Sequence, residues 1–262
     1  MTVFHIYYEP DKSKVLSGID ERIKTREPGY ICVADGNILT MVHKNIEYRK
    51  VVQGSMFSIV DSSWVPLLVK YIYGYKWEQY CGSQIFDDMT KMKRYRMYFL
   101  GSSQKVLDAL KKEMVEVDAN ILDMTFKELP FCKVEEFDYE DIAANINADN
   151  PDIIWVALGA PKQEQFAARL VKHLNRGVVI PVGAVFNFRS GLGIKRAPQW
   201  MVKMHLEFVY RIFSEPSKQI KRCYNIISTL PVIILEEYRK KNQKATMTSL
   251  HLKSWQEIQQ DS

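Results

Sequence analysis

A repeated unit of apolar run, turn and helical segment constrains the fold of this chain more than any other feature. It is clearest where the run RYRMYFLGSS is followed by the amphipathic segment QKVLDALKKEMVEV. The same order recurs in YICVADGN with ILTMVHKNIEYRKVV, in SMFSIVDSS with SWVPLLVKYIYG and in PDIIWVALGAPKQE with QEQFAARLVKHL, and RGVVIPVGAVFNF supplies a fifth apolar run. Strands that alternate with helices of this length predict an α/β fold, in which helices cover both faces of a parallel sheet.

The character of the sequence changes after Gly193. Residues 194–244 are basic, aromatic and helical in pattern, and residues 245–262 are polar. We therefore expect an α/β core over residues 1–193, a helical appendage over 194–244 and a poorly ordered polar tail over 245–262. The formal net charge is only +5, and much of the excess falls in the appendage. Such a surface suits phosphates or anionic lipid, and because no nucleic-acid-binding motif accompanies it we expect no nucleic-acid partner.

Short-range patterns disfavour several classes of protein. The four cysteines lack CxxC spacing and the five histidines form no metal-ligand motif, so we assign no metal. Neither a GxSxG motif nor a GxGxxG motif is present, which disfavours a serine hydrolase and a dehydrogenase. No apolar run approaches the roughly 18 to 20 residues that span a bilayer, and no signal-peptide pattern opens the chain, so a cytoplasmic location is the default expectation.

Polar residues follow each expected strand. In an open parallel sheet the ligand lies beyond the carboxyl ends of the strands, so these side chains are candidates for a common site. They are Asp35, Asn37, Asp61, Ser102, Gln163 and Asn187.

Two of these positions carry both a structural and a functional interpretation. Asp61 is either a helix N-cap or a general base at the edge of the sheet. Gly101 and Ser102 are either part of a tight strand-to-helix turn or a phosphate site at a helix N-terminus.

The segment Gly159–Glu164 is a more specific signal. A Gly-x-Pro turn after the apolar run IIWVAL places Lys162, Gln163 and Glu164 at the start of a helix. The structural interpretation is a capped turn with Pro161 near the first helical position. Three polar residues after so apolar a strand favour a site, in which Lys162 meets phosphate and the other two bind sugar hydroxyls or a base.

Arginines recur through the basic appendage, with aromatic residues between them. Arg196, Arg211 and Arg222 are the candidates, because the guanidinium fork matches the oxygens of a diphosphate. The aromatic residues are more often packing than recognition.

Three strings together carry a family resemblance. LGAPKQE, PVGAVFNFRSG and KRAPQWMVKMHLEFVYRIFSEP resemble the WecG/TagA/CpsF glycosyltransferases, glycosyltransferase family 26, over the span from about Tyr30 to about Arg222. The resemblance implies a Rossmann-like core with a helical C-terminal appendage, an architecture of the GT-E type. It also implies inverting transfer of an N-acetylhexosamine, commonly N-acetylmannosamine, from a UDP-sugar to an undecaprenyl-diphosphate-linked sugar in cell-surface polysaccharide synthesis. Such enzymes use neither metal nor cofactor, bind the inner face of the cytoplasmic membrane peripherally and can form homo-oligomers.

The resemblance also assigns roles to residues. It implies that Asp61 is the catalytic base and that Arg196, Arg211 and Arg222 contact the diphosphates of the substrates. It places the donor sugar nucleotide against Asp35, Asn37, Gln84, Gly101, Ser102, Gly159, Pro161, Lys162, Gln163, Glu164 and Asn187.

Several positions depart from the family pattern. The usual Thr-x-Asn of the first loop is replaced by Ala34-Asp35-Gly36-Asn37, which leaves open whether Asp35 or Asn37 takes the role of the family asparagine. An arginine expected before Gly82 is missing, and Gln84 and Asn187 stand where the family usually has acidic residues. These changes leave the donor sugar and the acceptor open. They also leave an alternative in which the chain is a membrane-associated scaffold that binds nucleotide sugars without turnover.

Overall fold

A computed structural model describes residues 1–192, 198, 201, 210, 213 and 216–260, and for residues 217–218 and 244–260 it describes the backbone alone. The central element is a five-stranded parallel sheet in the order β3-β9-β8-β6-β7. Its strands are β3 (Gly29–Tyr30), β6 (Met97–Gly101), β7 (Thr125–Lys127), β8 (Ile153–Ala157) and β9 (Val178–Pro181). The parallel sheet expected from the repeated unit is therefore confirmed.

A second, two-stranded parallel sheet continues from the first. The chain leaves β3 through Ile31, whose N–H donates to the Val179 carbonyl, and enters β4 (Cys32–Ala34), which pairs with β5 (Ser58–Val60). One stretch of backbone thus joins both sheets, and the segments after β4 and β5 reach the same edge as those after β6, β8 and β9. A short antiparallel hairpin of β1 (Thr2–Val3) and β2 (Ile6–Tyr7) precedes them.

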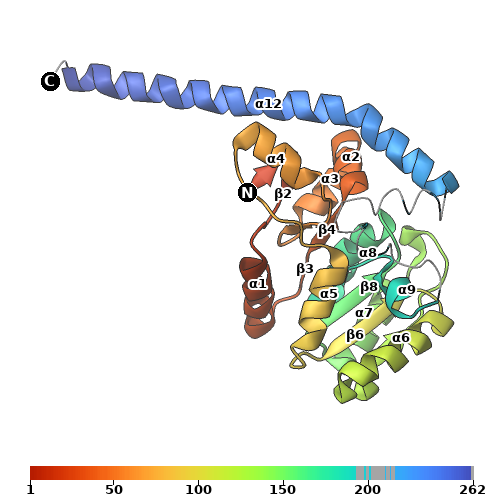
Figure 1. Cartoon of the computed structure of the whole chain (residues 1–262). Helices are drawn as coiled ribbons and strands as arrows, with labels where there is room; N and C mark the ends of the chain where they lie inside the picture. The colour runs from red at the N-terminus through yellow and green to blue at the C-terminus, as the bar shows by residue number, and fades with distance from the viewer. Residues whose placement is uncertain (193–197, 199–200, 202–209, 211–212, 214–215, 261–262) are drawn as a thin grey trace.

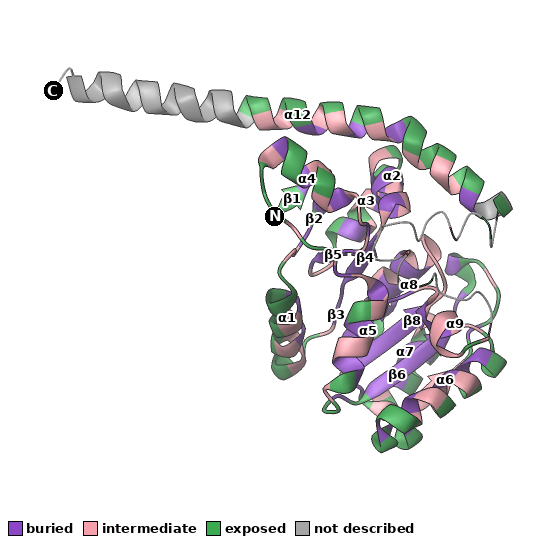
Figure 2. Ribbon diagram, viewed as in Figure 1, coloured by how far each residue is buried: buried purple, intermediate pink, exposed green. Residues whose placement is uncertain are grey.

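Side chains of β8 alternate between two apolar clusters, one on each face of the sheet. Ile154 and Val156 pack in one cluster, and Ile153 and Trp155 in the other. Helices cover both faces, as expected (Figure 2). The first cluster is covered by α2 (Gly36–Lys44), α3 (Ile46–Gln53), α4 (Val65–Tyr73), α7 (Tyr139–Asp149) and α8 (Lys162–Leu170). The second is covered by α1 (Lys12–Thr25), α5 (Gly82–Lys91), α6 (Gln104–Val117) and the short α9 (Val185–Arg189).

A long C-terminal helix, α12 (Pro216–Gln260), lies across α2 and α4 and extends beyond the core (Figure 1). Glu237 anchors it, because this buried carboxylate accepts hydrogen bonds from the Phe4 N–H at 3.0 Å and the Tyr73 hydroxyl at 2.7 Å. Ile233 is also buried at this contact. No helix among the described residues is long and apolar enough to cross a bilayer.

One local expectation was wrong. The helical pattern from Ile38 to Val52 forms two helices instead of one, because Asn45 is extended and its side chain accepts from the Tyr48 N–H at 3.0 Å, which caps α3. The backbone of α12 is helical over residues 245–260. That stretch contains neither glycine nor proline and is rich in good helix formers.

Candidate active site

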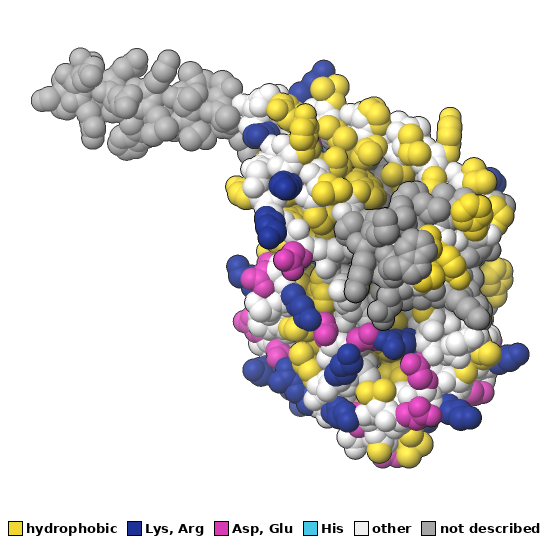
Figure 3. All heavy atoms as spheres, in the orientation of Figure 1, with side chains coloured by type: hydrophobic (Ala, Val, Ile, Leu, Met, Phe, Trp, Pro, Cys, Tyr) yellow, Lys and Arg dark blue, Asp and Glu magenta, His cyan; other side chains and the backbone are white. Residues whose placement is uncertain are grey.

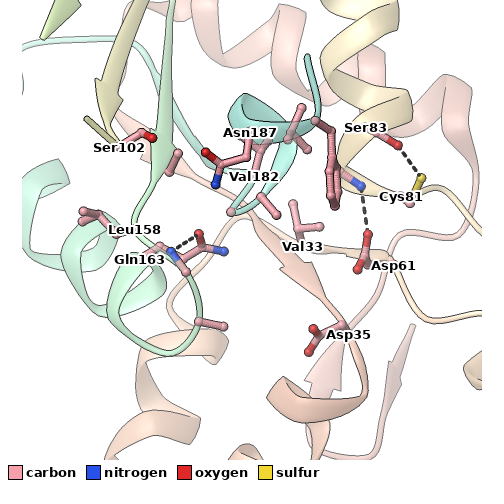
Figure 4. A pocket seen from close by; sticks show the side chains of 18 of the residues that line it. Val33, Asp35, Asp61, Cys81, Ser83, Ser102, Leu158, Gln163, Val182 and Asn187 are labelled. Atoms are coloured by element: carbon pink, nitrogen blue, oxygen red, sulfur yellow. Dashed lines mark hydrogen bonds between the residues drawn. The ribbon is translucent and has the colours of Figure 1, made fainter. Parts of the chain in front are cut away.

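A cavity of about 380 Å³ opens at the carboxyl edge of the strands. Residues that follow β4, β5, β6, β8 and β9 all line it, as expected for a ligand site in such a sheet. Asp35, Asp61, Ser102, Gln163 and Asn187 are among them, and Asn37 is not. Figure 4 shows Asp35 and Asp61 on one side of this cavity, with Ser102 and Gln163 on the other.

Asp61 is held in place at the end of β5. Its Oδ1 accepts a hydrogen bond from the backbone N–H of Gly82 at 2.9 Å, at the start of α5, and its carbonyl accepts one from Gln79 Nε2 at 2.6 Å. The carboxylate therefore meets the N-terminus of α5, where the helix dipole favours negative charge. It does not cap α4, the helix that follows it in sequence: α4 begins after Trp64 and has no side-chain cap.

Asp35 connects the core to the C-terminal helix. Its Oδ1 caps α2 by accepting from the N–H groups of Asn37 at 2.9 Å and Ile38 at 3.0 Å, and its Oδ2 forms an ion pair with Arg222 of α12. Arg222 and Gln219 both line the cavity. The side chain of Asn37 instead donates to the sulfur of Met41 at 3.7 Å. Of the two candidates for the role of the family asparagine, Asp35 is the one that faces the cavity.

The three polar residues at the start of α8 point in different directions. Gln163 lines the cavity, and its Oε1 accepts from the Gly159 N–H at 3.0 Å. Glu164 is fully buried beneath it and accepts from Gln163 Nε2 at 2.8 Å and the Tyr48 hydroxyl at 3.1 Å. Burial raises the pKa of Glu164 to about 7. Lys162 turns away, donates to the Cys132 carbonyl and lies 4.7 Å from the centre of the Phe137 ring.

The turn after β6 is more specialised than its sequence indicates. Gly101 adopts a φ of +94°, and a Cβ there would lie 2.8 Å from the Ala157 carbonyl oxygen, so the two strands approach too closely for a side chain. Ser102 has a φ of +64° and lines the cavity. The side chain of Ser103 does not cap α6; instead the Gln104 N–H donates to Glu128 at 3.0 Å.

These observations place seven of the predicted site residues around one cavity. Besides Asp35, Asp61, Ser102, Gln163 and Asn187, the cavity is lined by Gly159 and Arg222. Gln84 faces the start of its own helix, where its Oε1 accepts from the Cys81 N–H at 2.8 Å. Gly101, Pro161, Lys162 and Glu164 are also not part of the lining. Arg196 and Arg211 lie outside the described residues.

Three of the lining residues that the sequence did not indicate come from one segment of the chain. Cys81, Ser83 and Gln79 stand before or at the start of α5, and Cys81 Sγ contacts Ser83 Oγ at 3.1 Å. The spacing of Ile85, Phe86 and Met89, which are all buried, was the available sign of a helix at this point. Among the described residues, no group of three or more His, Cys, Asp and Glu side chains is close enough to hold a metal ion.

Comparison with known proteins decides the family. The model of the glycosyl transferase WecG/TagA/CpsF family matches residues 1–245. The chain belongs to this family. The match confirms the resemblance seen in the sequence and favours a glycosyltransferase over the dehydrogenase alternative. In this WecG/TagA/CpsF member, the segments that follow β5 and β8 bring Asp61 and Gln163 to one cavity.

Two relatives of this chain share one name. Both are called N-acetylglucosaminyldiphosphoundecaprenol N-acetyl-beta-D-mannosaminyltransferase. The relative from Bacillus spizizenii (strain W23) is 28% identical over 198 residues, which is 72% of this chain and 72% of the relative. The relative from Bacillus subtilis (strain 168) is 26% identical over 238 residues, which is 87% of this chain and 90% of the relative.

Proposed function

We propose that this protein is an inverting glycosyltransferase that moves an N-acetylhexosamine, of the N-acetylmannosamine type, from a UDP-sugar to an undecaprenyl-diphosphate-linked sugar. The observation that carries the proposal is the position of Asp61 in the wall of the cavity, fixed by the Gly82 N–H in the same space that Arg222 and Gln163 line. The names of the two relatives supply the transferred sugar and the lipid-linked acceptor, and the family resemblance supplies the UDP-sugar donor.

The chemistry requires a base and a means to stabilise the leaving group. Asp61 takes the proton from the acceptor hydroxyl while the oxygen of that hydroxyl attacks the anomeric carbon of the donor sugar. The bond from the anomeric carbon to UDP breaks on the opposite side. Negative charge then develops on the diphosphate of UDP. In this proposal Arg222 and backbone N–H groups stabilise that charge, with no metal and no cofactor.

Arg222 has a carboxylate partner with which a diphosphate can compete. Its guanidinium pairs with Asp35, and the side chain is only 25% exposed. An incoming diphosphate competes for the same guanidinium, and it offers two or more oxygens to the fork in place of one carboxylate oxygen.

The proposal includes peripheral binding to the cytoplasmic face of the membrane, where the lipid-linked acceptor would lie. Most of the exposed large apolar side chains described on α12, with the exception of Val232, fall within an arc of about 80° on one helix face. They are Ile220, Tyr224, Ile227, Leu235 and Tyr238. The neighbouring α4 adds Leu67, 64% exposed, and Tyr71, 79% exposed. Figure 3 shows hydrophobic side chains gathered on the upper part of this face, over α4 and α12.

A donor screen tests the function directly. The purified protein is incubated with a synthetic undecaprenyl-diphosphate N-acetylglucosamine and each of several UDP-sugars, and the products are identified by mass spectrometry. We expect one N-acetylhexosamine to be added from UDP-N-acetylmannosamine, with release of UDP. Donor binding without transfer to any acceptor of a panel would instead favour the scaffold that binds nucleotide sugars.

A further inference from the structure

The side-chain amide of Gln163 has a single satisfactory orientation. The Gly159 N–H, a backbone group that can only donate, lies 3.0 Å from Oε1, and a carboxylate oxygen of Glu164 lies 2.8 Å from Nε2. A flipped amide would set two donors against each other at Gly159 and two acceptors against each other at Glu164. The oxygen therefore faces Gly159, and one of the two N–H groups of Nε2 is used by Glu164.

The second N–H of Gln163 has the cavity before it. Gln163 is 5% exposed and lines the cavity, and in Figure 4 its amide nitrogen points toward the middle of that space. Gly183, across from it, has no side chain; a Cβ there would lie 3.4 Å from Gln163 Oε1. An N–H group that points into the cavity can donate a hydrogen bond to an acceptor atom of a bound ligand.

Glu164 does not reach the cavity itself. It is fully buried, and each of its carboxylate oxygens has a protein partner, Gln163 on one side and the Tyr48 hydroxyl of α3 on the other. The Tyr48 hydroxyl can donate to an ionised carboxylate and, after rotation, accept from a protonated one. The bond from Gln163 to the other oxygen therefore persists in either state of Glu164.

We propose that Glu164 is a positioning residue which, with Tyr48, holds the Gln163 amide so that its remaining N–H contacts an oxygen of the bound sugar nucleotide. This inference rests on the proposed function and deepens it. It replaces the expectation that Glu164 touches the donor directly. The oxygen belongs either to the sugar or to the uridine diphosphate, and the experiment separates these two sources.

Binding of UDP and of UDP-N-acetylmannosamine is measured by calorimetry. We expect Gln163→Ala and Glu164→Leu each to weaken binding about 5- to 10-fold, the value of one hydrogen bond. If the lost contact is to the sugar, only the affinity for UDP-N-acetylmannosamine falls. If it is to uridine diphosphate, the affinities for both probes fall. Glu164→Gln should stay within about threefold of wild type, because its amide can accept from Gln163 and donate to Tyr48.

A double-mutant cycle distinguishes positioning from a direct contact. If Glu164 acts through Gln163, the double variant Gln163→Ala/Glu164→Leu binds no more weakly than Gln163→Ala alone. Additive losses, or a Glu164→Gln variant as weak as Glu164→Leu, would overturn the inference. If Glu164→Leu does not fold, Glu164→Gln/Tyr48→Phe replaces it, since the amide at position 164 then has no acceptor at Tyr48. Retention of full affinity by that variant would also overturn the inference.

A measurement without ligand keeps the inference separate from the proposed function. The side-chain NH₂ signals of Gln163 are identified in ¹H–¹⁵N spectra by their loss in Gln163→Ala. We expect slow hydrogen exchange at the N–H that is bonded to residue 164 in wild type and Glu164→Gln, and faster exchange at this N–H in Glu164→Leu or its replacement. Unchanged exchange contradicts the inference. Failure of wild type to bind either probe contradicts the proposed function alone.

Discussion

The backbone N–H of Gly82 donates a 2.9 Å hydrogen bond to Oδ1 of Asp61, so that a carboxylate at the end of β5 is fixed by the first residue of α5. The contact sets the direction of the carboxylate, and the N-terminus of α5 favours its ionised form. Oriented and ionised is the state in which a general base accepts a proton. The proposed mechanism therefore depends on the hydrogen bond from Gly82 to Asp61 more than on any other contact.

Removal of Arg222 should weaken binding of the nucleotide. The guanidinium lines the cavity and is paired with Asp35. We expect Arg222→Ala to raise the Kd for UDP about 10-fold or more, because a charge-assisted hydrogen bond contributes about 1.5–3 kcal/mol. Arg239→Ala is the matched control, since Arg239 is exposed on the same helix. Equal effects of the two substitutions would contradict the role of Arg222.

Glu237 should be important for stability, and its neighbour Glu236 should not. Glu237 is 3% exposed and accepts hydrogen bonds from Phe4 and Tyr73, whereas the side chain of Glu236 is 42% exposed and lies 3.4 Å from His43. We expect Glu237→Ala to lower the free energy of unfolding by about 1–3 kcal/mol, since it leaves buried donors unpaired. Glu236→Ala should cost less than about 1 kcal/mol. Denaturant melts of the two variants provide the comparison.

The raised pKa of Glu164 predicts a pH dependence of stability. Its pKa is about 7 in the folded protein, above the value of about 4.3 in an unfolded chain. Between these values the folded state binds more protons, so the contribution of Glu164 to stability is fully present below pH 4 and is lost as the pH rises through 7. We therefore expect the difference in free energy of unfolding between Glu164→Gln and wild type, measured in denaturant melts, to favour the variant more at pH 8 than at pH 5. The same difference at both pH values would contradict the assignment.

The exposed apolar face of α12 predicts association with lipid. Tyr224, 72% exposed, and Ile227, 70% exposed, lie on that face, and Lys221 lies beside them. We expect Tyr224→Glu/Ile227→Glu to reduce co-sedimentation with anionic vesicles several-fold, because burial of each apolar side chain contributes about 1.5–3 kcal/mol. The control is a double substitution on the exposed face of α6, Lys105→Gln/Lys112→Gln, which changes the net charge by the same amount. Equal binding by the first variant and wild type would remove this face from the membrane contact.

Periodicity made the sheet predictable, and it failed where the signal is short. β6 and β8 are five-residue strands between turns, each followed by an amphipathic helix, so their pattern is unambiguous. The two-residue strands β1 and β2 are too short to show alternation. The helix α5 follows a polar stretch and not a strand, so it fell outside the repeated unit on which the prediction relied.

The sequence predicted which edge of the sheet carries the site, but not which side chains contact one another there. Any polar residue directly after a parallel strand reaches the carboxyl edge, which is why Asp35, Asp61 and Ser102 line the same cavity. Consecutive residues of a helix, in contrast, point about 100° apart. Gln163 therefore faces the cavity while Glu164 is buried and Lys162 reaches Cys132. The pairing of Asp35 with Arg222 depends on how α12 docks, which no local pattern encodes.

Substitution of Asp61, the proposed base, tests the central claim most directly. Turnover of UDP-N-acetylmannosamine with the lipid-diphosphate acceptor is measured by UDP release for wild type, Asp61→Asn and Asp61→Ala, with UDP affinity measured in parallel. We predict a loss of turnover of roughly 10²- to 10⁴-fold in both variants, with UDP binding within about threefold of wild type. Turnover close to that of wild type in Asp61→Ala would show that Asp61 is not the base.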